Sequence, residues 1–274
     1  MIHPRANFLE LAFGHQAWAD LGAPVGPPLL LVHGWGGDSR SWAPLAAQLT
    51  SAYRVLTVDV RGHGCSSRPP AGVHEFDPEA IAEDLVAVLD AADVERVVAV
   101  GHSWGGQLVT ALAVTHPERV ERLVALDPAY GATSEADLSA MYDRWRSAEA
   151  RTELRRFAES AFGPDTPADV REQVHAGFRD TDLRVLADAF AAMYLTERSF
   201  GLWPATAAYL SRVGAPTLSV YSGEAAARRG RDLPAPAGSQ VVAYTGVGHY
   251  LHQERPAELA KLLMTWLAET GRPG

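Results

Sequence analysis

The chain has 274 residues, of which 47% are hydrophobic, and this is enough to bury a large core in one domain or in one domain with an insertion. Its formal net charge of −9 and the lack of any lysine and arginine cluster argue against nucleic acid as a partner. A single cysteine, Cys65, excludes an internal disulfide bond. Because Met1–Arg5 does not begin a signal peptide and no apolar run is long enough for a membrane span, we expect a soluble cytoplasmic protein.

The first half of the chain alternates short apolar runs with amphipathic segments. Continuous apolar runs such as 29–32 are typical of strands that are buried on both faces, and Asp77 is placed to cap the helix that follows it. The predicted strands are 7–13, 15–20, 29–32, 55–58, 97–100 and 123–126, and the predicted helices are 41–49, 78–91 and 107–116. This alternation predicts an α/β fold with a mostly parallel sheet that carries helices on both faces.

The alternation then breaks for one long helical stretch. Residues 133–198 show helical patterns only, after which strands at 217–221 and 240–244 and a last helix at 256–268 resume the earlier order. We therefore predict a core domain formed by residues 1–130 and 204–274, with an all-helical cap inserted at 131–203.

A serine occupies the sharpest predicted turn of the chain. The apolar run at 97–100 ends in Gly101-His102-Ser103-Trp104-Gly105, and a helix is predicted directly afterwards. A strand, a Gly-x-Ser-x-Gly turn and a helix in this order expose the serine hydroxyl at the carboxyl end of a strand, where the two glycines allow a close backbone approach. Ser103 is therefore the predicted nucleophile.

A serine nucleophile needs a general base and an oxyanion hole. His249 follows the last predicted strand, and it is the predicted base because serine hydrolases of this kind carry serine, acid and histidine in that order along the chain. The alternative candidates for the base are His33, His63, His102 and His252. The backbone N–H groups of Trp35 and Trp104 are the predicted oxyanion donors, since Trp35 lies in the glycine-rich segment 33–37 that follows another strand. We expect both indoles to form an apolar floor for the substrate.

These segments together resemble the α/β-hydrolase fold superfamily. The matching pieces are His33-Gly34-Trp35-Gly36, Asp59-Val60-Arg61-Gly62-His63-Gly64-Cys65-Ser66, Gly101-His102-Ser103-Trp104-Gly105-Gly106 and Gly248-His249 with Glu254-Arg255-Pro256. The resemblance covers nearly the whole chain. It implies an eight-stranded, mostly parallel sheet, a helical cap over the serine and a structural role for the loop that begins at Asp59.

The chain departs from this family in the acid of the triad. Most relatives carry an aspartate in a Gly-Glu-x-Asp segment before the last strand, whereas this chain has Gly223-Glu224-Ala225-Ala226. Some enzymes of the fold place the acid after an earlier strand, where this chain has Asp127. Asp127 is therefore the predicted acid; Glu224, a serine–histidine dyad and a purely structural Asp-Pro turn stay as alternatives.

The resemblance implies a serine hydrolase that forms an acyl-enzyme on an ester, a lactone or a thioester. The alternatives are a cofactor-independent dioxygenase or a C–C bond-cleaving, lyase-like enzyme that uses a His–Asp pair as base, and a small-molecule receptor without catalysis. The His-Gly-Trp loop, Asp127 and Ala226 favour the dioxygenase, whereas Trp104 stands where that group commonly has histidine.

The aromatic residues of the cap predict a small apolar substrate, aromatic or polyketide-like. Trp145, Tyr194, Trp203 and Tyr250 are the predicted substrate-binding residues, although aromatic residues at helical spacing are more often core. No metal-ligand spacing and no phosphate-binding loop is present in the sequence, so we expect no metal and no cofactor. We expect a monomer or a homodimer whose partner is the small-molecule substrate, with no nucleic acid and no membrane.

Overall fold

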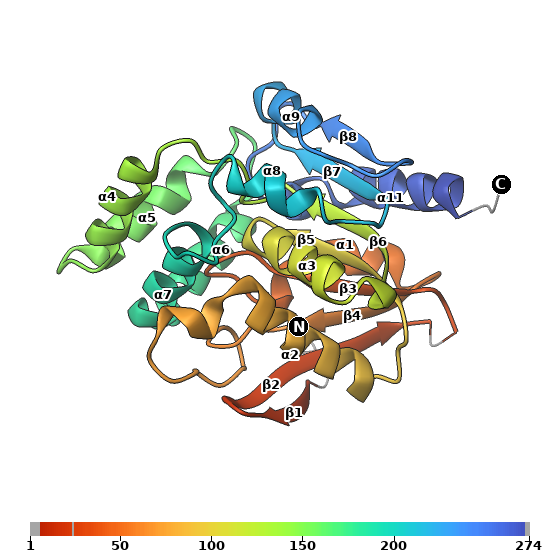
Figure 1. Ribbon diagram of the computed structural model, residues 1–274, viewed down its shortest axis with the longest axis horizontal. Coiled ribbons are helices and arrows are strands. Elements are labelled where there is room, and N and C mark those ends of the chain that lie inside the picture. Colours follow the sequence, from red (N-terminus) through yellow and green to blue (C-terminus); the bar gives the residue numbers. More distant parts are fainter. Residues whose placement is uncertain (1–5, 24, 272–274) are drawn as a thin grey trace.

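A computed structural model describes residues 6–23 and 25–271; Met1–Arg5, where no signal peptide is expected, lie outside them. The described residues form one eight-stranded sheet in the order β1-β2-β4-β3-β5-β6-β7-β8 (Figure 1). The strands, in sheet order, are β1 Asn7–Leu11, β2 Gly14–Gly22, β4 Arg54–Val58, β3 Pro28–Val32, β5 Val97–His102, β6 Val120–Leu126, β7 Thr217–Tyr221 and β8 Gln240–Ala243. β1 and β2 are antiparallel to their neighbours, and the strands from β4 to β8 pair in parallel. The predicted mostly parallel α/β sheet is confirmed.

Helices cover both faces of the sheet, and the alternation of side chains along β3 shows why. Leu29 and Leu31 belong to one hydrophobic cluster, whereas Leu30 and Val32 belong to the other, because successive side chains of a strand point to opposite faces. The first cluster includes side chains of α1 (Ala43–Leu49) and α11 (Pro256–Thr270), and the second includes side chains of α2 (Pro78–Ala91) and α3 (Trp104–Thr115). These four residues are fully buried, as their continuous apolar pattern predicts.

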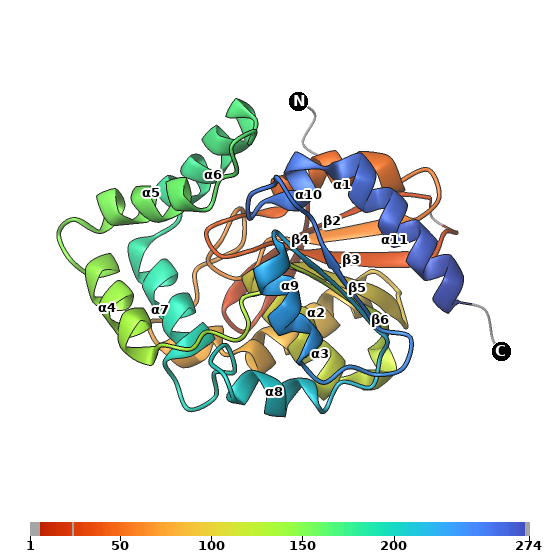
Figure 2. The same ribbon diagram turned by 90° about the horizontal axis from the view of Figure 1, so that it is seen from above.

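Four further helices lie together at one side of the sheet, between β6 and β7 in the chain (Figure 2). These cap helices are α4 Glu135–Trp145, α5 Ala150–Ser160, α6 Ala168–Asp180 and α7 Leu183–Tyr194. The two chain segments that lead into and out of them are paired with each other. The Ala132 N–H donates to the Gly201 carbonyl at 3.0 Å, and the Trp203 N–H donates to the Ala132 carbonyl at 2.8 Å. The helical insertion therefore leaves and rejoins the core at one place.

Some local features differ from the sequence prediction. Asp77 occupies the N-cap position of α2, but its side chain does not cap the helix; it accepts hydrogen bonds from His74 at 3.0 Å and from Arg198 at 3.3 Å. The sequence analysis does not predict three helices, because each is too short to show an amphipathic pattern: α8 Ala205–Leu210, α9 Glu224–Arg231 and α10 Leu251–Glu254. Short 3₁₀ turns occur as η1 Ser39–Trp42, η2 Val73–Phe76 and η3 Pro117–Arg119.

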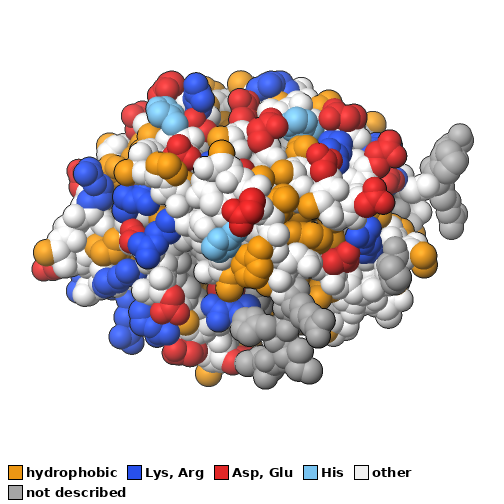
Figure 3. All heavy atoms as spheres, turned by 90° about the horizontal axis from the view of Figure 1, so that it is seen from below, with side chains coloured by type: hydrophobic (Ala, Val, Ile, Leu, Met, Phe, Trp, Pro, Cys, Tyr) orange, Lys and Arg blue, Asp and Glu red, His pale blue; other side chains and the backbone are white. Residues whose placement is uncertain are grey.

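The surface carries charges of both signs in close proximity. On the face that Figure 3 shows, arginine and lysine side chains gather toward one end, with acidic side chains next to them. Ion pairs such as Arg184–Asp188 at 3.3 Å and Arg54–Asp20 at 2.7 Å join the two signs. The large hydrophobic residues exposed among the described residues are Phe8, Val25 and Trp203, which is an ordinary number of single exposed side chains. No helix in the described ranges has the length and apolar character to cross a membrane.

The turn that carries Ser103 has no room for a side chain at its glycines, and this predicts an effect of substitution on stability. A Cβ at position 105 would lie 2.1 Å from the Val32 carbonyl oxygen, whereas a Cβ at position 214 would meet nothing within 4 Å. We expect Gly105→Ala to lower the free energy of unfolding by about 3 kcal/mol or more. The control Gly214→Ala should change it by less than about 1 kcal/mol. Urea unfolding of both variants measures this difference, and equal effects would contradict the packing argument.

Candidate active site

Ser103 lies at the turn between β5 and α3 in a strained backbone conformation. Its φ of 52° and ψ of −118° are rare for a residue with a side chain. The turn is held by neighbouring strands, because the Ser103 N–H donates to the Leu126 carbonyl at 2.9 Å. A Cβ on Gly101 would lie 2.1 Å from the Gly105 carbonyl oxygen, so the chain closes on itself around the serine. This is the geometry expected of an exposed serine nucleophile.

Asp127 and His249 form a short hydrogen bond, although they are 122 residues apart in the sequence. His249 Nδ1 lies 2.6 Å from Asp127 Oδ2. The same carboxylate accepts from the Ser222 N–H at 3.0 Å and from the Ser222 hydroxyl at 2.7 Å. Burial raises the pKa of Asp127, but the hydrogen bonds from His249 and Ser222 outweigh burial and leave that pKa below its ordinary value. Asp127 is therefore a carboxylate at neutral pH and fixes the orientation of the imidazole.

The sheet explains why these groups meet. Ser103, Asp127 and Ser222 follow β5, β6 and β7, which are adjacent parallel strands, and His249 follows β8. The carboxyl ends of parallel strands lie at one edge of the sheet, so the loops that follow them converge. Ser103 and His249 line the same pocket. No hydrogen bond joins their side chains within the described ranges, and this bond is often long before a substrate is bound.

The two predicted oxyanion donors face no competing acceptor. Within the part of the chain that the structure describes, neither the Trp35 N–H nor the Trp104 N–H donates to a protein group. A hydrogen bond to His63 fixes the loop that carries Trp35: the N–H of the next residue, Gly36, donates to His63 Nε2 at 3.3 Å. Burial lowers the pKa of His63 to about 3, so this imidazole stays neutral and keeps its acceptor nitrogen. Two unpaired N–H groups next to a strained serine are what an oxyanion hole requires.

The two indoles have different surroundings. Trp35 lines the pocket, donates its Nε1–H to the Leu186 carbonyl of α7 at 2.9 Å and packs against Phe178 with ring centroids 5.0 Å apart. Trp104 does not line the pocket. Its side chain is fully buried against His63 and Phe76, because it begins a helix whose apolar face enters the core. The expectation that both indoles form the substrate floor therefore applies to Trp35 alone.

The four predicted substrate-binding residues divide in the same way. Tyr194 and Tyr250 line the pocket. Trp145 does not line it, because it is buried behind Trp35, with ring centroids 4.6 Å apart. Trp203 is 40% exposed and lies outside the lining, at the point where the chain returns from the cap. Sequence spacing identified aromatic residues of the cap but not which side of each helix faces the serine.

Glu224, the alternative acid, is placed elsewhere. It begins α9, is exposed and pairs with Arg231 at 2.7 Å. The loop after β7 contributes Ser222 instead, and we did not predict this residue. Its position directly after a buried strand, at the edge of the sheet where Ser103 and Asp127 also lie, is the signal in the sequence that could have identified it. Asp127, and not Glu224, is the carboxylate in contact with His249.

The backbone around His249 is tied to the cap, which the sequence did not indicate. The His249 N–H donates to the Ala161 carbonyl, at the end of α5, at 2.8 Å. Glu254 links the two parts through its carboxylate, which accepts from the Gly248 N–H at 2.9 Å and from the Thr166 hydroxyl of the cap at 2.9 Å. The His249 carbonyl in turn lies 2.9 Å from His102 Nε2. No group of three histidine, cysteine, aspartate or glutamate residues that could hold a metal occurs among the residues described.

Comparison with known proteins agrees with this geometry. Residues 27–198 match the family model of the alpha/beta hydrolase fold. The chain belongs to the α/β-hydrolase fold family. 2-Hydroxymuconate semialdehyde hydrolase of Pseudomonas sp. (strain CF600) is 31% identical over 266 residues, which are 89% of this chain and 88% of that protein. A solved hydrolase from Pseudomonas aeruginosa PA01 superposes with a TM-score of 0.82 at 27% identity and covers 96% of this chain and 98% of its own.

Other relatives match over a shorter part. Esterase YbfF of Escherichia coli (strain K12) is 38% identical over 100 residues, and this match spans 36% of the present chain and 38% of the relative. The predicted fold and the resemblance to the α/β-hydrolase superfamily are confirmed.

The buried histidines predict how stability depends on pH. Burial lowers the pKa of His63 and of His252 to about 3, whereas an unfolded histidine titrates near 6.5. The unfolded chain therefore binds more protons between these values, so the free energy of unfolding falls as the pH drops from about 6.5. His252→Phe should reduce this slope by about 1 kcal/mol per pH unit. Urea unfolding at pH 7.5, 6 and 5 measures the slope in the wild type and in the variant. An unchanged slope would contradict the lowered pKa of His252.

Proposed function

We propose that the protein is a serine hydrolase that cleaves a C(=O)–X bond of a small, largely apolar ester, lactone or thioester. The observation that carries the proposal is the 2.6 Å contact between Asp127 and His249, made at the pocket that Ser103 also lines. Acyl transfer requires a nucleophile, a base that a carboxylate orients, and unpaired N–H donors for the oxyanion. Its membership of the α/β-hydrolase fold family supports the same reaction class.

Each group of the site has a defined role in the proposed mechanism. His249 Nε2 takes the proton of the Ser103 hydroxyl while the serine oxygen attacks the carbonyl carbon. The N–H groups of Trp35 and Trp104 stabilise the oxyanion that forms. His249 then gives the proton to the leaving alcohol or thiol, and water, activated by the same histidine, releases the acid. Asp127 stabilises the imidazolium in both steps, because the low pKa of its carboxyl keeps it charged.

The pocket supports a small substrate with an apolar part. Its cavity volume is about 70 Å³. Trp35, Phe157, Phe178 and Phe190 provide aromatic surface within it. Aromatic side chains of this kind bind apolar rings and chains and exclude water from the reacting carbonyl.

Cleavage of a C–C bond is the second candidate. It rests on the 31% identity to 2-hydroxymuconate semialdehyde hydrolase, which extends over 89% of this chain. Ser103, His249 and Asp127 would serve that reaction with the same roles, since it also ends in hydrolysis at a carbonyl carbon. A parallel assay of simple esters and of 2-hydroxymuconate semialdehyde separates the two candidates.

The reactivity of Ser103 is the first prediction of the proposal. A fluorophosphonate should add once to the wild-type protein, because His249 activates the serine and the oxyanion donors bind the phosphoryl oxygen. Intact-protein mass spectrometry, with Ser103→Ala as control, measures the adduct. An unmodified protein that is shown to be folded would contradict acyl transfer; it would favour proton abstraction from an aromatic heterocycle that reacts with oxygen, or a receptor.

The identity of the acid gives a second prediction. Asp127→Asn should lower kcat by about a thousandfold or more, because a neutral amide no longer stabilises the imidazolium. Ser222→Ala should cost about tenfold, since the carboxylate loses one of its hydrogen bonds. Glu224→Gln, in the loop where most relatives carry the acid, should leave kcat nearly unchanged. Steady-state kinetics on a p-nitrophenyl ester gives all three values, and a larger loss in Glu224→Gln than in Asp127→Asn would overturn the choice of acid.

A further inference from the structure

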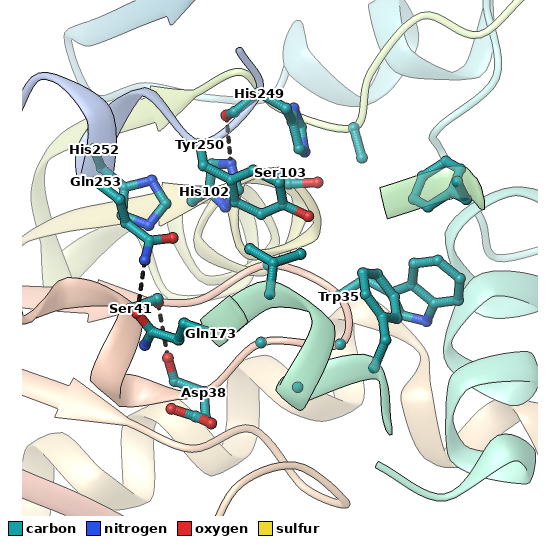
Figure 4. A pocket seen from close by; sticks show the side chains of 18 of the residues that line it. Trp35, Asp38, Ser41, His102, Ser103, Gln173, His249, Tyr250, His252 and Gln253 are labelled. Atoms are coloured by element: carbon teal, nitrogen blue, oxygen red, sulfur yellow. Dashed lines mark hydrogen bonds between the residues drawn. The ribbon is translucent and has the colours of Figure 1, made fainter. Parts of the chain in front are cut away.

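The pocket has two chemically different ends. In Figure 4, Ser103 lies between Trp35, on one side, and a polar group formed by Ser41, Gln173, His252 and Gln253, on the other. We call this group the polar end. The triad chemistry does not use any of its side chains, so their function needs another explanation.

Two glutamines form the centre of the polar end. Gln253 of α10 donates from Nε2 to Oε1 of Gln173 of α6, at 2.9 Å, so that one amide comes from the core and the other from the cap. A pair of primary amides joined by one hydrogen bond keeps a free NH₂ group on one partner and a free carbonyl oxygen on the other. This remains true if both amides are turned around, so it does not depend on how their oxygen and nitrogen atoms are assigned. The pair therefore offers a donor and an acceptor side by side.

His252 is a buried, uncharged residue at the same end. Its side chain is fully buried between Trp42 and His102, with ring centroids 4.5 Å and 4.3 Å away. Neither ring nitrogen has a hydrogen-bond partner within the described residues. Burial lowers the pKa of His252 to about 3, so this ring is neutral at physiological pH.

The polar end holds no cation that could bind an acid. Among the described residues that line the pocket there is no lysine or arginine, and the fixed charge present is the carboxylate of Asp38. That carboxylate is already paired with Arg40, whose Nε donates to it at 2.9 Å. A substrate carboxylate at this end would lose its hydration without gaining a counter-charge. Neutral groups with both a donor and an acceptor meet no such cost.

We propose that the polar end is an acyl-chain subsite that selects substrates with a neutral, amide-like group, held by the Gln173–Gln253 pair. The apolar leaving group then lies on the aromatic side of Ser103, next to Trp35. This assignment rests on the proposed serine hydrolase function and names its substrate class: esters of acids that carry a secondary amide in the chain. The specificity-determining residues are Gln173 and Gln253.

The test uses three p-nitrophenyl esters of matched chain length. The acyl groups are N-acetyl-β-alanyl, hexanoyl and adipoyl, which place an amide, a methylene pair or a terminal carboxylate along a similar chain. We expect kcat/KM, divided by the rate constant of hydroxide-catalysed hydrolysis, to be at least about tenfold higher for the amide ester than for the hexanoate. The adipate monoester should be the poorest substrate.

Variants identify the residues responsible. Gln173→Leu and Gln253→Leu should each lower the amide-to-hexanoate ratio of kcat/KM about tenfold, because the amide ester loses its hydrogen-bond partners and the hexanoate has none to lose. The control is Arg198→Leu, which removes another contact between cap and core, the 3.3 Å bond to Asp77, without touching the pocket. It should leave the ratio as in the wild type, so a general loosening of the cap is distinguished from loss of the subsite.

The two proposals fail in different ways. If none of the esters is hydrolysed and the fluorophosphonate does not modify Ser103, the hydrolase function is wrong. If the hexanoate is hydrolysed but is preferred over the amide ester, or if the ratio stays constant in both glutamine variants, the subsite is wrong and the hydrolase function stands.

Discussion

The hydrogen bond between His249 and Asp127 is the contact on which the rest of the site depends. It joins the loops after β6 and β8 at 2.6 Å, and it exists because a parallel sheet brings the carboxyl ends of its strands to one edge. Ser222 supplies two further hydrogen bonds that keep the carboxylate charged in a buried place. Without those donors, burial alone would raise the pKa of Asp127 and weaken its hold on the imidazole.

Asp127 contacts His249 from a strand other than the one on which the resemblance predicts a carboxylate. The loop after β7 has Ala226 where the resemblance to the fold family leads one to expect an aspartate. The adjacent strand β6 ends at the same edge, one strand nearer to Ser103, and Asp127 reaches His249 from there. Asp127 adopts a φ of 41°, a left-handed conformation that aspartate tolerates better than most residues. The geometry of the pair is preserved although its position in the chain is not.

The cap is part of the same arrangement and does more than cover the pocket. Its residue Ala161 accepts the His249 N–H, and Thr166 shares the Glu254 carboxylate with Gly248. Gly163 and Gly248 approach so closely that a Cβ on Gly163 would lie 2.5 Å from the Gly248 nitrogen. The loop that carries the base is therefore fixed by the cap as well as by the core, which couples the base to the walls of the substrate pocket.

The sequence by itself determined the fold and the pieces of the site. The buried apolar runs could only be strands, and the glycines beside Ser103 were needed where backbone atoms come within van der Waals contact. Chain order also pointed to His249, and the resemblance to the fold family pointed to Asp127. Which side of a helix faces the pocket was not determined, as Trp145 of α4 shows, since helical spacing is the same for core and pocket residues. Only the tertiary structure decided that Ser222 supports Asp127, that Gln173 meets Gln253 and that the cap holds the His249 loop. These contacts join residues far apart in the sequence, and no local pattern encodes such a distance.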